Sequence, residues 1–450
     1  MIDSMHASAG RGAAVATATM VDDQPTVDGA PSTVTKRLTC GCGAVYPFQQ
    51  MLTACPACSG KLRYTMSGQF SLPIRDPAAP RSIWRYFDLL PLEHRDDVVS
   101  LDEGFSEIVE LPELSSVLRG ARLFLKMDLA QNPTGTFKDR EASLIISRCK
   151  ALGLDRLVFY STSNTGRAYM HYAAASGLTT YLFLPAECDY KQTATIAKGP
   201  NNHLIAVDGE YPRIAPYAKA FAAANGLTLV APLHDRTEAY ATLAYEQAEQ
   251  MPHCDFFAQT IASGMGPIGF VRGHEHLERL GARPPYGAPR IVCVQSSETN
   301  AMSLAFQAGK PVLTEADMPA AFPTQLYEPT LNSTNPINNY PELVESLQSS
   351  NGLMTDVPPA FVDVEGDLLI RALERRGIAP AFDLEKSLLI GYSGLVRLAD
   401  EGRFQRGDRI LLLATGRGPQ KTRELVTPDL VIRPSVDDPK DVFARLAGRA

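Results

Sequence analysis

Residues Asn132–Arg140 read Asn-Pro-Thr-Gly-Thr-Phe-Lys-Asp-Arg, and the rest of the chain is organised around this segment. Pro133 fixes one backbone angle and Gly135 permits a tight turn, so the residues before Lys138 can hold a defined shape. Two threonines precede a stretch with helical apolar spacing, which places Lys138 where a loop becomes a helix. At such a junction backbone N–H groups are available to an anion. A lysine amine that is held there and partly desolvated can condense with a carbonyl, whereas an ordinary surface lysine is the alternative.

Length and composition favour a globular protein with two or more domains. The chain has 450 residues, of which 45% are apolar and 21% are charged. Its 43 Lys and Arg against 50 Asp and Glu give a net charge of −7, which does not favour nucleic acid or an anionic membrane as a partner. No apolar run approaches the roughly 20 residues that span a bilayer, and the first residues lack the pattern of a secretory signal. We therefore expect a cytoplasmic protein.

Four of the eight cysteines are close together in the sequence. Cys40 and Cys42 form one pair, Cys55 and Cys58 form another, and small turn residues follow. This pattern is typical of a zinc ribbon, in which two turns bring paired thiolates to one tetrahedral ion. Four thiolates close the coordination shell, so the zinc would be structural; the alternative is a segment that folds without metal. The other four, which we interpret as small core residues in a reducing compartment, are Cys149, Cys188, Cys254 and Cys293.

Short apolar segments alternate with amphipathic helical segments along the chain. The segments that we predict as strands include 156–160, 179–185, 203–209, 227–232, 255–262, 290–295 and 409–414. This alternation favours an α/β fold with parallel sheets that are covered by helices. The expected boundaries are a tail at 1–35, a zinc-ribbon-like module at 36–65, a large domain from 66–149 and 252–430, a small α/β domain at 150–251, and a C-terminal tail at 431–450.

Two turns between a strand and a helix have the composition of anion sites. Residues Ser161–Arg167 read Ser-Thr-Ser-Asn-Thr-Gly-Arg, and hydroxyls with backbone N–H groups at a helix start suit a carboxylate. Residues Ser263–Gly269 read Ser-Gly-Met-Gly-Pro-Ile-Gly, and these glycines let backbone amides approach a phosphate. Ordinary helix caps are the alternative for both turns. The stretch 310–352 is rich in Pro, Asn and Ser, so we expect a loop-laden insertion there.

Together these motifs resemble those of one enzyme family. Residues Asn132–Arg140 resemble the lysine motif of threonine synthases, which are fold type II enzymes that use pyridoxal 5'-phosphate (PLP). The Ser161 turn, the glycine turn and a final Thr415-Gly turn follow in the order of that family. A cysteine-containing N-terminal module is also common there, and cysteate synthases are near relatives. The resemblance covers roughly residues 80 to 420 and implies the two-domain fold type II architecture.

The resemblance implies a role for each motif. Lys138 would form the internal Schiff base with PLP and act as general base at the α-carbon of the substrate. Asn164 would bind the 3'-oxygen of PLP, and Thr415 would bind its pyridine nitrogen and leave that nitrogen unprotonated. The residues implied for cofactor binding are Phe137, Lys138, Asn164, Ser263, Gly264, Met265, Gly266 and Thr415. The residues implied for substrate binding are Ser161, Thr162, Ser163, Thr165, Arg167, His234 and Arg236.

The expected substrate is a small phosphorylated amino acid. Threonine synthases hold the leaving phosphate partly through an Asn-Pro-x-Arg-like segment, and the corresponding stretch Val230–Glu238 lacks that Asn, although His234 or Arg236 could supply charge. The first hypothesis is conversion of O-phosphohomoserine to threonine, and the second is β-replacement on O-phosphoserine or a similar activated serine. A third is a PLP-fold protein retained for binding or regulation, against which the intact Lys138 argues. A homodimer is expected by analogy.

Overall fold

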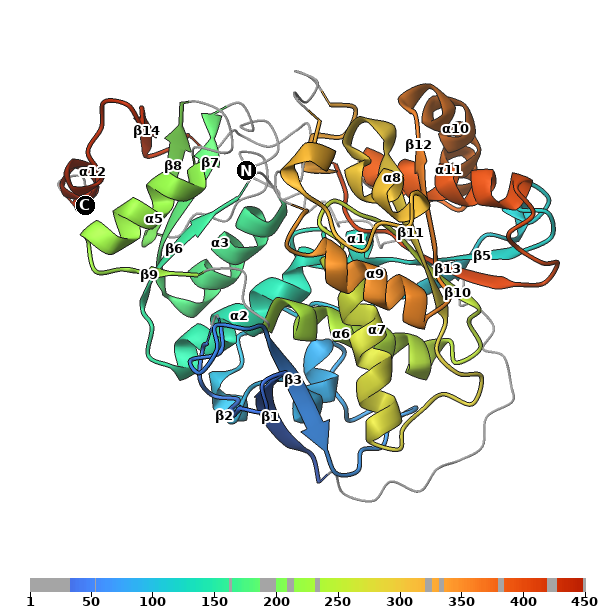
Figure 1. Ribbon diagram of the computed structural model, residues 1–450, viewed down its shortest axis with the longest axis horizontal. Helices are drawn as coiled ribbons and strands as arrows, with labels where there is room; N and C mark the ends of the chain where they lie inside the picture. Colours follow the sequence, from blue (N-terminus) through green and yellow to red (C-terminus); the bar gives the residue numbers. More distant parts are fainter. Residues whose placement is uncertain are drawn as a thin grey trace, which may run out of the picture.

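The computed structural model describes residues 33–52, 54–161, 164–186, 200–208, 214–230, 235–319, 326–331, 336–378, 384–418 and 427–447. Figure 1 shows two α/β units side by side, with a small three-stranded sheet at their lower edge. The predicted α/β class, with helix-covered parallel sheets and a small N-terminal module, is confirmed. Within the described ranges, no helix has the length and apolar character needed to cross a membrane.

The first sheet has six strands in the order β12-β11-β10-β13-β5-β4. Neighbouring strands are parallel except at one edge, where β4 pairs antiparallel with β5. The strands are β4 (Ile108–Glu110), β5 (Arg122–Lys126), β10 (Phe256–Thr260), β11 (Arg290–Ser296), β12 (Leu353–Val357) and β13 (Arg409–Leu413). Nearly continuous apolar runs, as in β13, fit a sheet that is covered on both faces.

Helices cover both faces of this sheet. They are α6 (Asp235–Gln250), α7 (Met265–Arg279), α8 (Ala301–Gln307), α9 (Tyr340–Ser349), α10 (Pro359–Arg375) and α11 (Lys386–Asp400). Leu123 and Leu125 of β5 pack in one core with α10 and α11, whereas Phe124 between them packs in a second core with α6, α7 and α9. This alternation is the two-residue period of a strand.

The second sheet is parallel and has the strand order β14-β8-β7-β6-β9. Its strands are β6 (Arg156–Tyr160), β7 (Thr179–Pro185), β8 (Asn202–Val207), β9 (Thr228–Leu229) and β14 (Leu430–Ile432), and its helices are α2 (Lys138–Ala151), α3 (Asn164–Ser176), α5 (Ile214–Ala224) and α12 (Pro439–Ala447). Leu157 and Phe159 pack with α2 and α3, and Val158 between them packs with α5 and α12. The short α1 (Asp128–Gln131) precedes the lysine segment.

The cysteine module is an antiparallel sheet of three strands in the order β2-β1-β3. The strands are β1 (Thr35–Cys40), β2 (Val45–Pro47) and β3 (Leu62–Ser67). A 3₁₀ helix, η1 (Ile83–Leu89), follows and buries Trp84, whose indole donates to Ser143 Oγ of α2 at 2.8 Å. The other 3₁₀ turns among the described residues are η2 (Arg95–Asp97), η3 (Pro112–Leu114), η6 (Ser297–Thr299), η7 (Glu315–Asp317) and η8 (Pro329–Leu331).

The packing of three segments differs from the expected domain boundaries. Helix α2, expected in the large domain, buries its apolar face in the core of the second sheet, and α6, expected in the small domain, packs in the core of the first sheet. The segment 431–450, expected as a tail, instead contains the end of β14 and all of α12. Leu430 and Ile432 alternate as a buried strand requires, and Val442 and Leu446 are buried at helical spacing.

The loop-laden insertion expected at 310–352 contains a regular helix. Pro341 lies in the first turn of α9, where a missing N–H costs no hydrogen bond. Leu343 and Leu347 then recur at four-residue spacing and pack in the core of the first sheet. This helix was not predicted, because the Pro, Asn and Ser residues before it indicated a loop.

Candidate active site

The loop before Lys138 is held by its own side chains. Asn132 Nδ2 donates to the carbonyl of Thr136 at 2.8 Å. The buried carboxylate of Asp139 accepts hydrogen bonds from the backbone N–H of Thr134 at 2.7 Å and from its hydroxyl at 2.5 Å. These contacts fix the backbone of the loop on both sides of the lysine.

Lys138 is the first residue of α2, at the predicted junction of loop and helix. Its side chain is 15% exposed, and Nζ donates to Tyr240 Oη at 2.8 Å and lies 4.4 Å from the centre of the Phe137 ring. Burial lowers the pKa of Lys138 to about 8, although the carboxylate of Glu141 opposes the shift. The lowered pKa increases the share of unprotonated amine, which is the form that condenses with a carbonyl or removes a proton.

Glu141 lies buried one helical turn after Lys138, and four side chains contact its carboxylate. Its Oε1 lies 2.5 Å from Arg236 Nε and accepts a hydrogen bond from Tyr169 Oη at 2.8 Å. Its Oε2 accepts a hydrogen bond from Tyr240 Oη and lies 3.8 Å from Lys138 Nζ. Burial by itself would raise the pKa of Glu141, but the charges of Arg236 and Lys138 lower it. We call these five residues the Glu141 cluster.

The turn after β13 lies directly against the lysine loop. The N–H of Phe137 donates to the carbonyl of Thr415 at 2.9 Å, and Thr136 pairs with Gly416 as an antiparallel bridge. The Thr415 hydroxyl lies 3.1 Å from the hydroxyl of Ser387. Two motifs that are far apart in the sequence are thus joined by backbone hydrogen bonds.

Asn164 begins α3 and is linked to the same turn through a buried carboxylate. Its Nδ2 donates to Glu385 Oε2 at 2.9 Å, and Glu385 Oε1 accepts from Ser387 Oγ at 2.6 Å. Since Ser387 also contacts Thr415, a chain of polar contacts joins Asn164 to Thr415. The buried Oδ1 of Asn164 has no hydrogen-bond partner among the described residues.

The glycine turn between β10 and α7 packs closely against neighbouring side chains. Gly264 has φ +78°, a left-handed conformation that glycine adopts without strain. A Cβ added at Gly266 would lie 2.3 Å from Gln259 Oε1, and one added at Gly269 would lie 2.5 Å from Cβ of Tyr240. Helix α7 therefore starts close to the helix that carries Tyr240, with its first N–H groups available to an anion.

The remaining sequence-based candidates take several positions. Ser161 is buried, and its Oγ accepts from the N–H of Gly166 at 2.9 Å, which caps the start of α3. Thr165 is half-buried, and Arg167 is buried in α3, where burial lowers its pKa. Arg236 lies in the Glu141 cluster. Thr162, Ser163 and His234 lie outside the described residues.

Glu141, Tyr240 and Glu385 were not predicted from the sequence as site residues. Glu141 follows Lys138 by three residues and Tyr240 follows Arg236 by four, so helical spacing places each beside a residue already chosen. That spacing could have identified both. Glu385 reaches Asn164 only through tertiary folding, and no local pattern marks it.

The four cysteines of the N-terminal module meet as predicted. Their Sγ atoms all lie within 4.8 Å of one another, with 3.4 Å between Cys40 and Cys58 and 3.8 Å between Cys42 and Cys55. A tetrahedral zinc ion bound at about 2.3 Å from each sulfur would place the sulfurs about 3.8 Å apart. The donor set and its spacing fit zinc, and this cluster could hold one ion.

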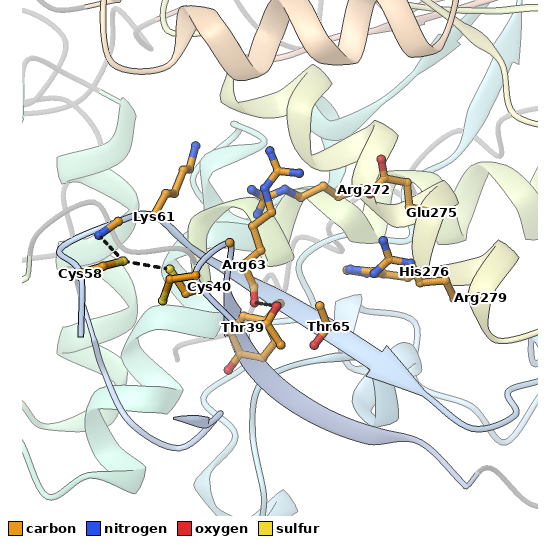
Figure 2. Close-up of a pocket in the computed structure, with 14 residues that line it drawn as sticks. Thr39, Cys40, Cys58, Lys61, Arg63, Thr65, Arg272, Glu275, His276 and Arg279 are labelled. Atoms are coloured by element: carbon orange, nitrogen blue, oxygen red, sulfur yellow. Dashed lines mark hydrogen bonds between the residues drawn. The ribbon is translucent and has the colours of Figure 1, made fainter. Parts of the chain in front are cut away.

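A cavity of about 640 Å³ lies between this module and α7. Figure 2 shows Lys61 and Arg63 on the module side of the cavity, and Arg272 and Arg279 on the α7 side. Four thiolates around a divalent zinc ion carry a net charge of −2, so nearby cations would offset that charge. Three of these cations also have carboxylate partners, since Lys61 and Arg272 pair with Glu342 and Arg63 pairs with Glu345.

The fold and the lysine site define a fold type II enzyme that depends on PLP. The pattern of the family "Pyridoxal-phosphate dependent enzyme" matches residues 99–416, and the chain belongs to this family. The threonine synthase of Methanosarcina acetivorans is 24% identical over 408 residues, which cover 88% of this chain and 95% of that protein. The cysteate synthase of Methanoculleus marisnigri is 26% identical over 400 residues, which cover 85% of this chain and 88% of that protein.

Solved structures support the same fold. The PLP-bound threonine synthase from Brucella melitensis aligns with a TM-score of 0.62 at 11% identity, over 92% of this chain and 100% of that one. The residues of this chain also fit the cofactor. Lys138 supplies an amine with a lowered pKa, Gly264 and Gly266 form a turn that excludes side chains, and Asn164 offers a buried polar atom to a ligand.

Proposed function

We propose that this enzyme converts O-phosphohomoserine and water to threonine and phosphate. PLP supplies the electron sink for the carbon next to the substrate amine. The chain must then accept a proton from Cα and a second proton from Cβ before phosphate leaves Cγ and water adds at Cβ. A general base that takes two protons in succession needs a route by which the first proton can leave.

The contact of Lys138 with Tyr240 carries this proposal. Lys138 Nζ and Tyr240 Oη are 2.8 Å apart, and the hydroxyl of Tyr240 is donated to Glu141. A proton on the Lys138 amine can pass to Tyr240 while the hydrogen of Tyr240 moves to Glu141. Lys138 is then neutral again, Tyr240 is unchanged and Glu141 is protonated. Neutral Lys138 is then the base for a second proton removal, although the charge of Arg236, which lowers the pKa of Glu141, opposes this transfer.

The charges near the lysine also suit a phosphorylated substrate. In the Glu141 cluster the side chains with the largest exposed fractions are those of Lys138, at 15%, and Arg236, at 19%. A guanidinium is well matched to a phosphate. Two of the relatives described above are a threonine synthase and a cysteate synthase, which agrees with an amino-acid substrate.

A second candidate function is β-replacement on O-phosphoserine or a similar activated serine. The observation that favours it is the similarity to cysteate synthases, at 26% identity for one relative and 28% for another from Methanoregula boonei. Such a reaction removes only the Cα proton. It therefore needs no second use of Lys138.

The test is incubation of the PLP-loaded protein with O-phosphohomoserine, following phosphate release and identifying the amino acid formed. We expect phosphate and threonine in equal amounts, and none from Lys138→Ala. Phosphate without threonine, or no reaction from protein with a clear cofactor absorbance, would refute the proposal. O-phosphoserine with sulfite would then test the second candidate.

A further inference from the structure

The Glu141 cluster contains one carboxylate that is more deeply buried than the two cations beside it. Glu141 is 1% exposed at its side chain, compared with 15% for Lys138 and 19% for Arg236. The cluster joins three helices, because Glu141 belongs to α2, Tyr169 to α3, and both Arg236 and Tyr240 to α6. Lys138 and Arg236 are therefore the accessible charged members of the cluster, and the carboxylate is enclosed.

The Nε edge of Arg236 can form a close ion pair with only one anion at a time. That edge lies 2.5 Å from Glu141 Oε1. A phosphate that binds this same edge would compete with the carboxylate, and a dianion competes better than a monoanion or a neutral ester. If Glu141 lost Arg236, it would keep the hydroxyls of Tyr169 and Tyr240 and the more distant Lys138.

The loss of Arg236 would change what Glu141 does. Burial favours the protonated carboxyl group, and the charge of Arg236 is the main factor that opposes protonation. Without that charge, Glu141 becomes a better acceptor for a proton that arrives from Lys138 through Tyr240. The proton that leaves the substrate Cα would thus end on Glu141, with Tyr240 restored and Lys138 neutral.

We propose that Glu141 selects phosphorylated substrates by holding Arg236 until a phosphate displaces it, and that this displacement prepares Glu141 to accept the proton taken by Lys138. The inference deepens the proposed function and rests on it for the identity of the substrate. It assigns to Glu141 the discrimination between phosphate esters and acyl esters of small amino acids. Glu141 is a positioning residue for Arg236 and the final proton acceptor for Lys138.

The experiment supplies the amino acid and the phosphate of the substrate as two separate molecules. PLP-loaded protein is incubated in D₂O with L-2-aminobutyrate, which lacks a phosphate, and exchange of its α-hydrogen is followed by proton NMR with and without inorganic phosphate. In the native protein we expect phosphate to accelerate exchange by about tenfold, as its occupation of Arg236 releases Glu141. In Glu141→Gln we expect slow exchange that phosphate does not accelerate.

A second measurement is the affinity for inorganic phosphate by calorimetry. Glu141→Gln should bind phosphate about tenfold more tightly or better, because Arg236 has lost its competing carboxylate. Glu278→Gln is the matched control, since it makes the same substitution at an exposed ion pair with Arg283 (3.2 Å) that lies outside the Glu141 cluster. This variant should keep both the native phosphate affinity, within about twofold, and the acceleration of exchange.

The outcomes distinguish the two proposals. Equal phosphate affinity in native protein and Glu141→Gln, or equal acceleration of exchange in both, would overturn the role of Glu141. If Glu141→Gln does not fold, Glu141→Asp replaces it, because the shorter carboxylate cannot keep the 2.5 Å contact with Arg236. Absence of threonine formation in the native protein would overturn only the proposed function, since the exchange experiment contains no O-phosphohomoserine.

Discussion

Loss of the Arg140 side chain in the Lys-Asp-Arg segment should strongly destabilise the fold. Its guanidinium is fully buried and pairs with Asp128 (Nε to Oδ2, 2.7 Å) and with Glu246. Lys126 Nζ also contacts Glu246, at 2.7 Å. Two cations therefore balance two carboxylates in a region that water does not reach. Arg140→Met keeps much of the side-chain volume and removes one of the cations.

The expected loss of unfolding free energy follows from the charges that remain after the substitution. After the substitution Lys126 can balance only one carboxylate, so the network carries one uncompensated negative charge. Asp128 keeps the hydroxyl of Ser106 at 2.6 Å, which does not replace a charge. Breaking a buried ion pair by removing one partner costs about 3–5 kcal/mol. We expect a loss of unfolding free energy in this range for Arg140→Met, and a smaller loss at low pH, where the remaining carboxylate can bind a proton.

The assay is urea unfolding followed by circular dichroism at two pH values. The matched control is Arg119→Met, which removes an arginine whose ion pair with Asp400 (2.7 Å) is 65% and 53% exposed at its two side chains. Exposed pairs contribute about 0–1 kcal/mol, so the control should unfold nearly as the native protein does. A loss in Arg140→Met no larger than in the control, or one that does not decrease with falling pH, would refute the reasoning.

The other predictions concern the cofactor and the metal. Lys138→Ala should remain folded by circular dichroism but lose turnover and the visible absorbance of covalently bound PLP; turnover by this variant would refute the assigned role. Because burial lowers the pKa of Lys138 to about 8, its amine is unprotonated above that pH, so uptake of PLP by cofactor-free protein should accelerate as pH rises through about 8. A midpoint near the ordinary lysine value would contradict this. Gly266→Ala should weaken PLP binding by about tenfold or more, as its Cβ would lie 2.3 Å from Gln259 Oε1, and a fluorescence titration with PLP measures the change. Cys58→Ser should remove zinc, measured by elemental analysis, while the PLP absorbance persists; retained zinc would show that the cluster is not the metal site.

The sequence predicted the two helix-covered sheets because their signals are local. Strands such as 156–160 and 409–413 are short apolar runs next to turn residues, and α/β order follows from their alternation with helices. The assignment of helices to sheets could not be predicted in this way. Helix α2 follows the lysine motif yet packs with the second sheet, since the choice depends on which apolar faces meet in three dimensions.

In the candidate site, too, the local motifs were predicted and the tertiary contacts were not. The lysine loop, the glycine turn and the Thr415 turn were predicted from residues that are adjacent in sequence, and the structure joins two of them through the backbone of Phe137 and Thr415. The carboxylates at the site were not predicted. Glu141 and Glu385 acquire their roles from partners on other helices and turns, and a buried charge is recognised only when those partners are known.

The first turn of α2 combines two tasks that its sequence does not separate. Lys138 and Glu141 lie on the face that meets Tyr240 and the site, while Arg140 turns into the buried network with Asp128. Successive helical residues point in directions about 100° apart, so neighbours in this motif must have different partners. Because α2 packs in the core of the second sheet while Arg140 is tied to α6 of the first, the start of this helix fixes both halves of the molecule around the lysine. The motif thus sets the position of the reactive amine through its neighbours as much as it supplies the amine itself.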